Sequence, residues 1–180
     1  MLRLDIERGK MNNPKILMVI APKDFQGREY GETKREFIEH GFKVVTASER
    51  VGECIEKFGS KVMAEVSIGD INPHDYEAIV FIGGPGAADF FHYSEALHLA
   101  KEAFEAGKIV GAICIAPTIL ANADILRGKN VTAFETEKEK LQQKGANFTG
   151  KEVEVDGNIV TANGPEASEE FAEEIAKLIS

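Results

Sequence analysis

Cys114 is the residue whose type and position most clearly suggest chemistry. It lies in the segment 111–120, GAICIAPTIL, where an apolar run ends at the cysteine and Pro117 follows. A nucleophile on a sharp turn between a strand and a helix needs small neighbours two residues before and after it, and Ala112 and Ala116 meet this need. Unpaired N–H groups at the start of the following helix would favour an anion and lower the pKa of the thiol. The pattern predicts a reactive thiolate on a nucleophile elbow; the alternative is a buried structural thiol, a common place for free cysteine.

A glycine-rich segment, IGGPGAADF at 82–90, follows another apolar run. Such a loop can present backbone N–H groups to an oxygen that develops negative charge. It departs from the dinucleotide-binding pattern because Asp89 stands where the last glycine would be. We therefore consider an oxyanion loop, with a simple chain reversal as the alternative.

Two further side chains are candidates for acid–base work. Glu29 begins the first helical pattern, where a carboxyl group could donate a hydrogen bond to a thiol or remove its proton, or simply be a solvated charge. His92 follows the glycine-rich segment and is a candidate for the same edge of the fold. The other three histidines, His40, His74 and His98, are interpreted as surface residues.

The elements that would position these residues alternate along the chain. Fully apolar strands separated by helical patterns predict an α/β fold of three layers: a mostly parallel, flavodoxin-like sheet with helices on both faces. An antiparallel hairpin is predicted near the C-terminus, at 151–163, and an irregular or hairpin excursion at 50–68. The predicted strands are 15–21, 42–48, 77–84, 108–114 and 129–134; helices are predicted over 28–40, from 94 to 107, from 117, before Gly145 and at the C-terminal end.

The bulk composition sets the class of protein. A chain of 180 residues with 43% hydrophobic and 28% charged residues is typical of one globular domain, which we place at 15–180. Residues 1–14 are interpreted as an N-terminal extension, with Met11 as an alternative start. The net charge of −9 argues against nucleic acid as a partner, and no apolar run is long enough to span a membrane. Two cysteines and no signal peptide favour the cytoplasm.

Taken together, these segments resemble the ThiJ/PfpI superfamily, which has a class I glutamine amidotransferase-like fold. AICIAPTIL resembles the nucleophile elbow, IVFIGGPGA the oxyanion loop, and VDGNIVTANGPEAS the C-terminal hairpin and the loop after it. The resemblance implies that Cys114 is the nucleophile, that Glu29 lies against it, and that backbone N–H groups of Gly83, Gly84 and Ile115 surround it. It also implies a homodimer or a larger homo-oligomer, and neither a metal nor a cofactor is expected.

The departures from this family bear on function. PfpI-type proteases place histidine directly after the nucleophile, where this chain has Ile115, and the deglycase-like branch has a histidine at the position that matches Phe134. A thiol and a carboxyl group without imidazole suit addition to a reactive carbonyl better than amide cleavage. We therefore expect a glyoxalase- or deglycase-like enzyme; the alternatives are a PfpI-like peptidase or amidase and a non-catalytic oxidation sensor acting through Cys114.

Overall fold

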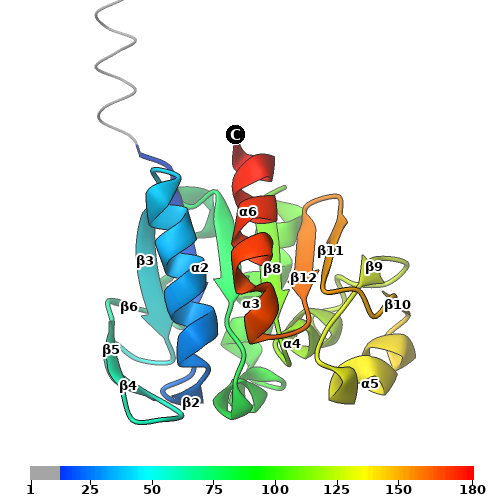
Figure 1. The fold of residues 1–180 in the computed structure, drawn as a ribbon, viewed down its shortest axis with the longest axis horizontal. Helices are drawn as coiled ribbons and strands as arrows, with labels where there is room; N and C mark the ends of the chain where they lie inside the picture. Colours follow the sequence, from blue (N-terminus) through cyan, green and yellow to red (C-terminus); the bar gives the residue numbers. More distant parts are fainter. Residues whose placement is uncertain (1–12) are drawn as a thin grey trace, which may run out of the picture.

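The central sheet is mostly parallel, and it confirms the predicted α/β architecture (Figure 1). The computed structural model describes residues 13–180. Every neighbouring pair in the sheet is parallel except the pair at the hairpin edge. From one edge to the other the strands are β11 (Val153–Asp156), β12 (Ile159–Ala162), β8 (Ile109–Ile113), β7 (Ala78–Phe81), β1 (Lys15–Val19), β3 (Lys43–Ser48) and β6 (Val66–Ser67).

Helices cover both faces of this sheet. In Figure 1, α2 (Gly27–Glu39) and α6 (Ser168–Ile179) pack side by side on the near face, and α3 (Ser94–Glu105) lies behind. A short helix, α4 (Pro117–Asn122), packs against α3, and α5 (Lys138–Gln143) packs against α4. The strands β7 and β8 are buried along their whole length, which explains why their sequences are apolar without alternation.

The two predicted hairpins form, but their places in the fold differ from expectation. The C-terminal hairpin is not an addition to the sheet, because β12 pairs in parallel with β8 and leaves only β11 antiparallel at the edge. The excursion after β3 forms a separate sheet from β2 (Lys23–Phe25), β4 (Gly52–Glu56) and β5 (Lys61–Ala64). The short strand predicted at 129–134 is β9 (Asn130–Val131), which pairs with β10 (Asn147–Phe148) outside the main sheet.

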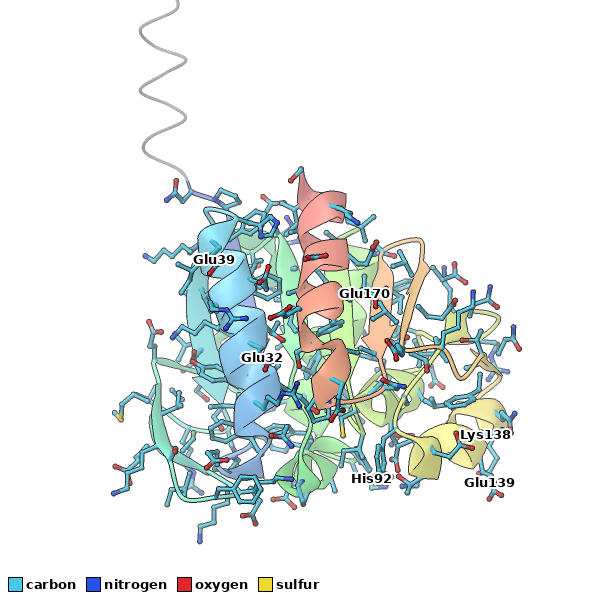
Figure 2. The ribbon with its side chains drawn as sticks, viewed as in Figure 1. Glu32, Glu39, His92, Lys138, Glu139 and Glu170 are labelled. Atoms are coloured by element: carbon cyan, nitrogen blue, oxygen red, sulfur yellow. The ribbon has the colours of Figure 1, made fainter. Side chains whose placement is uncertain are left out.

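The helices bury only a narrow stripe of their apolar residues. In α2, Tyr30 and Phe37 are buried while Ile38, which lies about 100° further round the helix, is 54% exposed. In the last turn of α6, Leu178 is 42% exposed. Figure 2 labels glutamates on the opposite, solvent-facing sides of both helices: Glu32, Glu39 and Glu170.

Three loops meet at the carboxyl edge of the sheet, which is the lower edge in Figure 1. They follow β1, β7 and β8, which are parallel neighbours. Ligands of such sheets bind beyond this edge. The loops after β7 and β8 carry the glycine-rich segment and Cys114, and the loop after β1 leads into α2.

The N-terminal extension predicted at 1–14 falls mostly outside the described residues. Its described end is attached to the sheet, because the Pro14 carbonyl accepts a hydrogen bond from the Lys43 N–H at 3.0 Å. Within residues 13–180, the helices are all too short or too polar to cross a bilayer.

Gly86 allows the loop before α2 to lie against the glycine-rich segment, and we expect Gly86→Ala to destabilise the fold by about 3 kcal/mol or more. A Cβ atom at this position would lie 1.8 Å from the Lys23 carbonyl oxygen, which belongs to the backbone and cannot rotate away. The matched control is Gly31→Ala in α2, where a Cβ atom would meet nothing within 4 Å and helix propensity predicts a gain of about 0.5–1 kcal/mol. Urea unfolding of both variants is the measurement, and equal stabilities would contradict the contact.

Candidate active site

Cys114 occupies the strained backbone conformation that defines a nucleophile elbow. Its φ of 64° is one of only three positive values at non-glycine positions among residues 13–180. The backbone is held from two sides, because the Cys114 N–H donates to the Ala162 carbonyl at 2.9 Å and the Phe134 N–H donates to the Cys114 carbonyl at 2.8 Å. Both small neighbours, Ala112 and Ala116, are fully buried. The strain, on the order of 1–3 kcal/mol, is thus maintained by the surrounding structure, and the half-buried thiol projects from the edge of the sheet.

Glu29 is completely buried in the first turn of α2 and lies beside this thiol. The Gly83 N–H donates to Glu29 Oε1 at 3.0 Å, and the Gly83 carbonyl accepts from the Gln26 N–H at 2.9 Å. Gln26 is the N-cap of α2, so the start of the helix is fixed to the loop after β7. Within the described chain, Glu29 Oε2 is buried without a partner of hydrogen-bond geometry, and the Cys114 thiol is the polar group next to this carboxyl. The predicted pairing of the two residues is therefore present.

Gly83 is required for this close approach, but its role differs from the one predicted. A Cβ atom on Gly83 would lie 2.5 Å from the Cβ of Cys114 and 2.7 Å from Glu29 Oε1. Its N–H is already engaged by Glu29, so it does not serve an oxyanion. The N–H groups directed at the sulfur are those of Gly84 and Ile115, two of the three predicted donors.

The pKa values of both groups are raised, whereas the sequence analysis expected a lowered pKa for the Cys114 thiol. Burial raises the pKa of the Glu29 carboxyl to about 8, against an opposing hydrogen bond from Gly83. Burial and the Glu29 charge raise the pKa of the Cys114 thiol to about 12, although the N–H groups of Gly84 and Ile115 act in the other direction. Helix α4 has only six residues and starts three residues beyond the cysteine, so it contributes little. At neutral pH both groups hold their protons.

The first proton leaves this pair as the pH rises through about 8. One proton then remains between the carboxyl and the sulfur of Cys114. The singly protonated pair can exist as thiol and carboxylate or as thiolate and carboxylic acid, and these two forms differ only in which atom holds the proton. Glu29 can thus act as a base toward the thiol and return the proton as an acid.

His92 does not join this site. It is exposed and lines a different cavity, together with Thr118 and Asn122, and no hydrogen bond within residues 13–180 links it to Cys114 or Glu29. The loop that carries His92 leaves the edge of the sheet and turns toward α4, where the Phe91 carbonyl accepts from Asn122 Nδ2 at 2.8 Å.

A cavity of about 260 Å³ lies on the far side of Phe134, and Cys114 and Glu29 do not line it. Phe134, 47% exposed and bonded through its N–H to the Cys114 carbonyl, lines it with Asn163 and Glu166. Glu166 Oε1 also lies 3.4 Å from Nη1 of Arg28, the residue that precedes Glu29. The segment VDGNIVTANGPEAS pointed to this loop but did not distinguish these two side chains from their neighbours.

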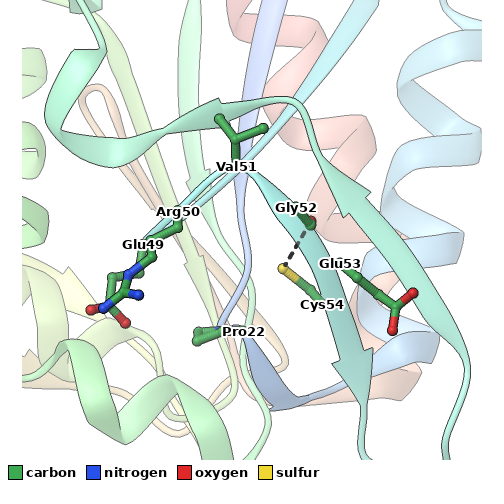
Figure 3. A pocket seen from close by; sticks show the side chains of 7 residues that line it. All are labelled: Pro22, Glu49, Arg50, Val51, Gly52, Glu53 and Cys54. Carbon is green, nitrogen blue, oxygen red and sulfur yellow. Dashed lines mark hydrogen bonds between the residues drawn. The ribbon is translucent and has the colours of Figure 1, made fainter.

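The second thiol, Cys54, has none of these features. It is 1% exposed, and its weak hydrogen bond of 3.9 Å goes to the Gly52 carbonyl (Figure 3). It lines a cavity of about 300 Å³ at the start of β4, between Pro22 and Arg50. Its sulfur therefore contacts a hydrogen-bond acceptor and, unlike that of Cys114, is not half-buried at the edge of the main sheet.

We expect iodoacetamide to alkylate Cys114 ahead of Cys54, at a rate that rises with pH across about pH 7 to pH 9. The half-buried thiol of Cys114 is accessible, but the proton of the pair is lost only near pH 8. Mass spectrometry of peptides after timed alkylation gives both rates. A rate already constant at about pH 6 would show a low-pKa thiolate and contradict the raised pKa.

The fold and the site together define a class of α/β proteins that hold a cysteine on an elbow at the carboxyl edge of a parallel sheet. The chain belongs to the DJ-1/PfpI family, whose sequence profile matches residues 14–178. This confirms the family resemblance.

Relatives extend over nearly the whole chain. The uncharacterized protein MJ0967 of Methanocaldococcus jannaschii is 40% identical over 176 residues, which cover 96% of this chain and 86% of that protein. YraA of Bacillus subtilis, named as a candidate cysteine protease, is 31% identical over 92% of this chain and 98% of that protein. Deglycase PH1704 of Pyrococcus horikoshii is 30% identical over 92% of this chain and 99% of that protein. The crystal structure of a ThiJ/PfpI domain protein from Brachyspira murdochii superposes with a TM-score of 0.90 at 32% identity, covering 93% of this chain and 98% of that one.

Proposed function

We propose that this protein is a cysteine-dependent enzyme that acts on small reactive carbonyls or their adducts, as a glyoxalase or deglycase. The observation that carries the proposal is the buried Glu29 carboxyl beside the half-buried Cys114 thiol, with one carboxyl oxygen not engaged by other groups. This pair can form a carbon–sulfur bond and move a proton at the same place. The named deglycase among the relatives is consistent with this class of substrate.

The first step on methylglyoxal is addition of the thiol to the aldehyde. The sulfur of Cys114 bonds to the aldehyde carbon, the π electrons move to oxygen, and Glu29 delivers the shared proton to that oxygen. The product is a hemithioacetal, and Glu29 is left as a carboxylate. The N–H groups of Gly84 and Ile115, which are directed at the sulfur, are the donors that we assign to the oxygen as charge develops.

The second step is an internal redox reaction. The Glu29 carboxylate removes the proton on the sulfur-bearing carbon and returns it to the neighbouring carbon, while the hydroxyl proton moves to the second oxygen. The first carbon is oxidised and the second reduced by two electrons each, which yields a lactoyl thioester without an external oxidant. Water then hydrolyses the thioester and releases lactate and the free thiol.

Peptide hydrolysis fits this site less well. Cleavage of an amide needs a general acid that protonates the leaving amine, usually histidine. Phe134 stands next to the elbow, and His92 lines another cavity.

The experiment is to incubate the purified protein with methylglyoxal and to measure lactate, with a fluorogenic peptide panel run on the same preparation. Enzyme-dependent lactate supports the carbonyl reaction. Peptide cleavage without lactate would favour the peptidase. If neither product forms and mild peroxide selectively adds two oxygens to Cys114, the result favours a non-catalytic oxidation sensor.

We also propose that the chain works in the cytoplasm as a homodimer or a larger homo-oligomer, without metal or cofactor. Both cysteines are free thiols, as expected in a reducing compartment. Sedimentation equilibrium tests the oligomeric state, and a monomer at micromolar concentration would contradict it.

A further inference from the structure

A second cavity lies beside α5, at the same end of the molecule as the thiol site but with different walls. Its volume is about 630 Å³, more than twice that of the cavity lined by Phe134 and Glu166. Its walls come from the loop at Phe91 and His92, from α4, and from α5 and the turns around it. Figure 2 shows His92 near α5, which carries the labelled Lys138 and Glu139. Ligand sites in proteins commonly have volumes of about 300–1,000 Å³.

The lining of this cavity is cationic, although the chain as a whole has a net charge of −9. Three basic side chains, Arg127, Lys140 and Lys144, face one acidic side chain, Asp124. Lys140 is paired with Glu137 at 3.1 Å, but Arg127 and Lys144 have no ion-pair partner within residues 13–180. Two unpaired cations on one concave wall form a local field that attracts an anion.

A buried acidic residue fixes one wall. Glu137 is only 3% exposed, and its Oε1 accepts hydrogen bonds from Thr118 Oγ1 at 2.9 Å and from Lys140 Nζ at 3.1 Å. It therefore connects α4 to α5 and holds Lys140 in place. The ammonium group of Lys140 also lies 5.1 Å from the centre of the Phe91 ring, on the opposite wall.

The Arg127 side chain is exposed, but it contacts the backbone of a neighbouring turn. A Cβ atom on Gly145 would lie 3.1 Å from Cγ and Nη1 of Arg127, so the side chain rests directly on the backbone of this glycine. The Gly128 N–H donates to the Gly145 carbonyl at 2.8 Å and joins the two turns. A guanidinium group placed in this way can bind an anion through two parallel hydrogen bonds.

We propose that this cavity binds the phosphate group of a small organic phosphate. Arg127 and Lys144 supply the charge, and the Asn122 and Gln143 amides line the remaining space, where they can bond to hydroxyl groups of the ligand. Asp124 is the one lining acid, and it opposes the anion. The proposal does not depend on the carbonyl chemistry of Cys114.

The test is isothermal titration calorimetry of the full chain with glycerol 3-phosphate and with inorganic phosphate, at about 0.15 M salt. We expect both to bind and glycerol not to bind. Arg127→Gln and Lys144→Gln should each weaken binding by about tenfold, the loss of one charged hydrogen-bonding group. Lys138→Gln is the matched control, because it removes the same charge from α5 but does not line the cavity, and it should change binding by less than about twofold.

A gain of affinity distinguishes a specific site from a loss of folding. Asp124 has a φ of 60°, a conformation that asparagine adopts readily, so Asp124→Asn removes the opposing charge without backbone strain. This variant should bind glycerol 3-phosphate about threefold more tightly. The proposal is wrong if the wild-type protein binds neither phosphate, if Lys138→Gln weakens binding as much as Arg127→Gln, or if Asp124→Asn has no effect.

Discussion

Replacing Cys114 by alanine should abolish lactate formation, with a fall in kcat/KM of at least about 10³-fold. Every covalent step proposed above passes through this sulfur, and no other group of the site can replace it. Glu29 would remain as a buried acid with no nucleophile beside it. Measurement of lactate from methylglyoxal, for the wild-type and variant proteins at equal concentration, gives the ratio directly.

Two further variants separate chemistry from folding. Cys114→Gly removes the sulfur and also relieves the positive φ of 64°, so it should be inactive and about as stable as the wild-type protein. Cys54→Ala removes the other thiol, which is 1% exposed and lies outside the candidate active site. This variant should lose some stability but keep the wild-type activity. Lactate formation by folded Cys114→Gly at the wild-type rate would exclude the covalent mechanism.

The sequence was sufficient for those parts of the molecule that depend on local pattern. Apolar runs without alternation predicted the parallel strands, and Ala112 and Ala116 on either side of Cys114 predicted the elbow. The helix predicted over 28–40 is α2, which ends at Glu39, and Gly41 follows with a φ of +87°. Each of these inferences uses residues within a few positions of one another.

The parts that could not be predicted depend on residues brought together from distant positions. The Gly83 N–H binds a carboxyl group 54 residues earlier in the chain, and this contact removes it from the set of donors around the sulfur. The direction of the Cys114 pKa follows from burial and from the Glu29 charge, which no pattern around the cysteine encodes. Likewise, the parallel pairing of β12 with β8 joins segments about 50 residues apart, so the hairpin could be predicted while its place inside the sheet could not.

Glu29→Gln should lower kcat/KM by about 10²- to 10⁴-fold while making the protein more stable above neutral pH. Glutamine has the same shape, and its oxygen can accept the hydrogen bond that the Gly83 N–H now gives to Glu29. It cannot take a proton from Cys114. Activity of the wild-type protein should rise as the pH passes through about 8, where the pair loses its first proton, and this rise should be absent in the variant.

The stability effect has a definite sign. The carboxyl pKa is raised from 4.5 in the unfolded chain to about 8 in the folded protein, so within this window the folded state holds a proton that the unfolded state has released. The stabilisation that protonated Glu29 gives the wild-type protein is fully present below the unfolded pKa of 4.5, and it is lost as the pH rises through about 8. Glutamine has no such dependence, so the stability of Glu29→Gln relative to the wild-type protein should grow between about pH 5 and pH 9, by on the order of 4 kcal/mol.

Urea unfolding at several pH values measures this difference, and Glu39→Gln is the matched control. Glu39 lies in the same helix on its exposed side, so its replacement removes the same charge without changing a buried group (Figure 2). Its unfolding free energy should follow that of the wild-type protein at every pH. If the Glu29→Gln difference were also constant with pH, the folded protein would not hold a proton on Glu29 at neutral pH, and the shared-proton mechanism would fail with it. A rising difference together with unchanged kcat/KM would instead leave Glu29 as a buried structural acid, because its proton would be present without being used.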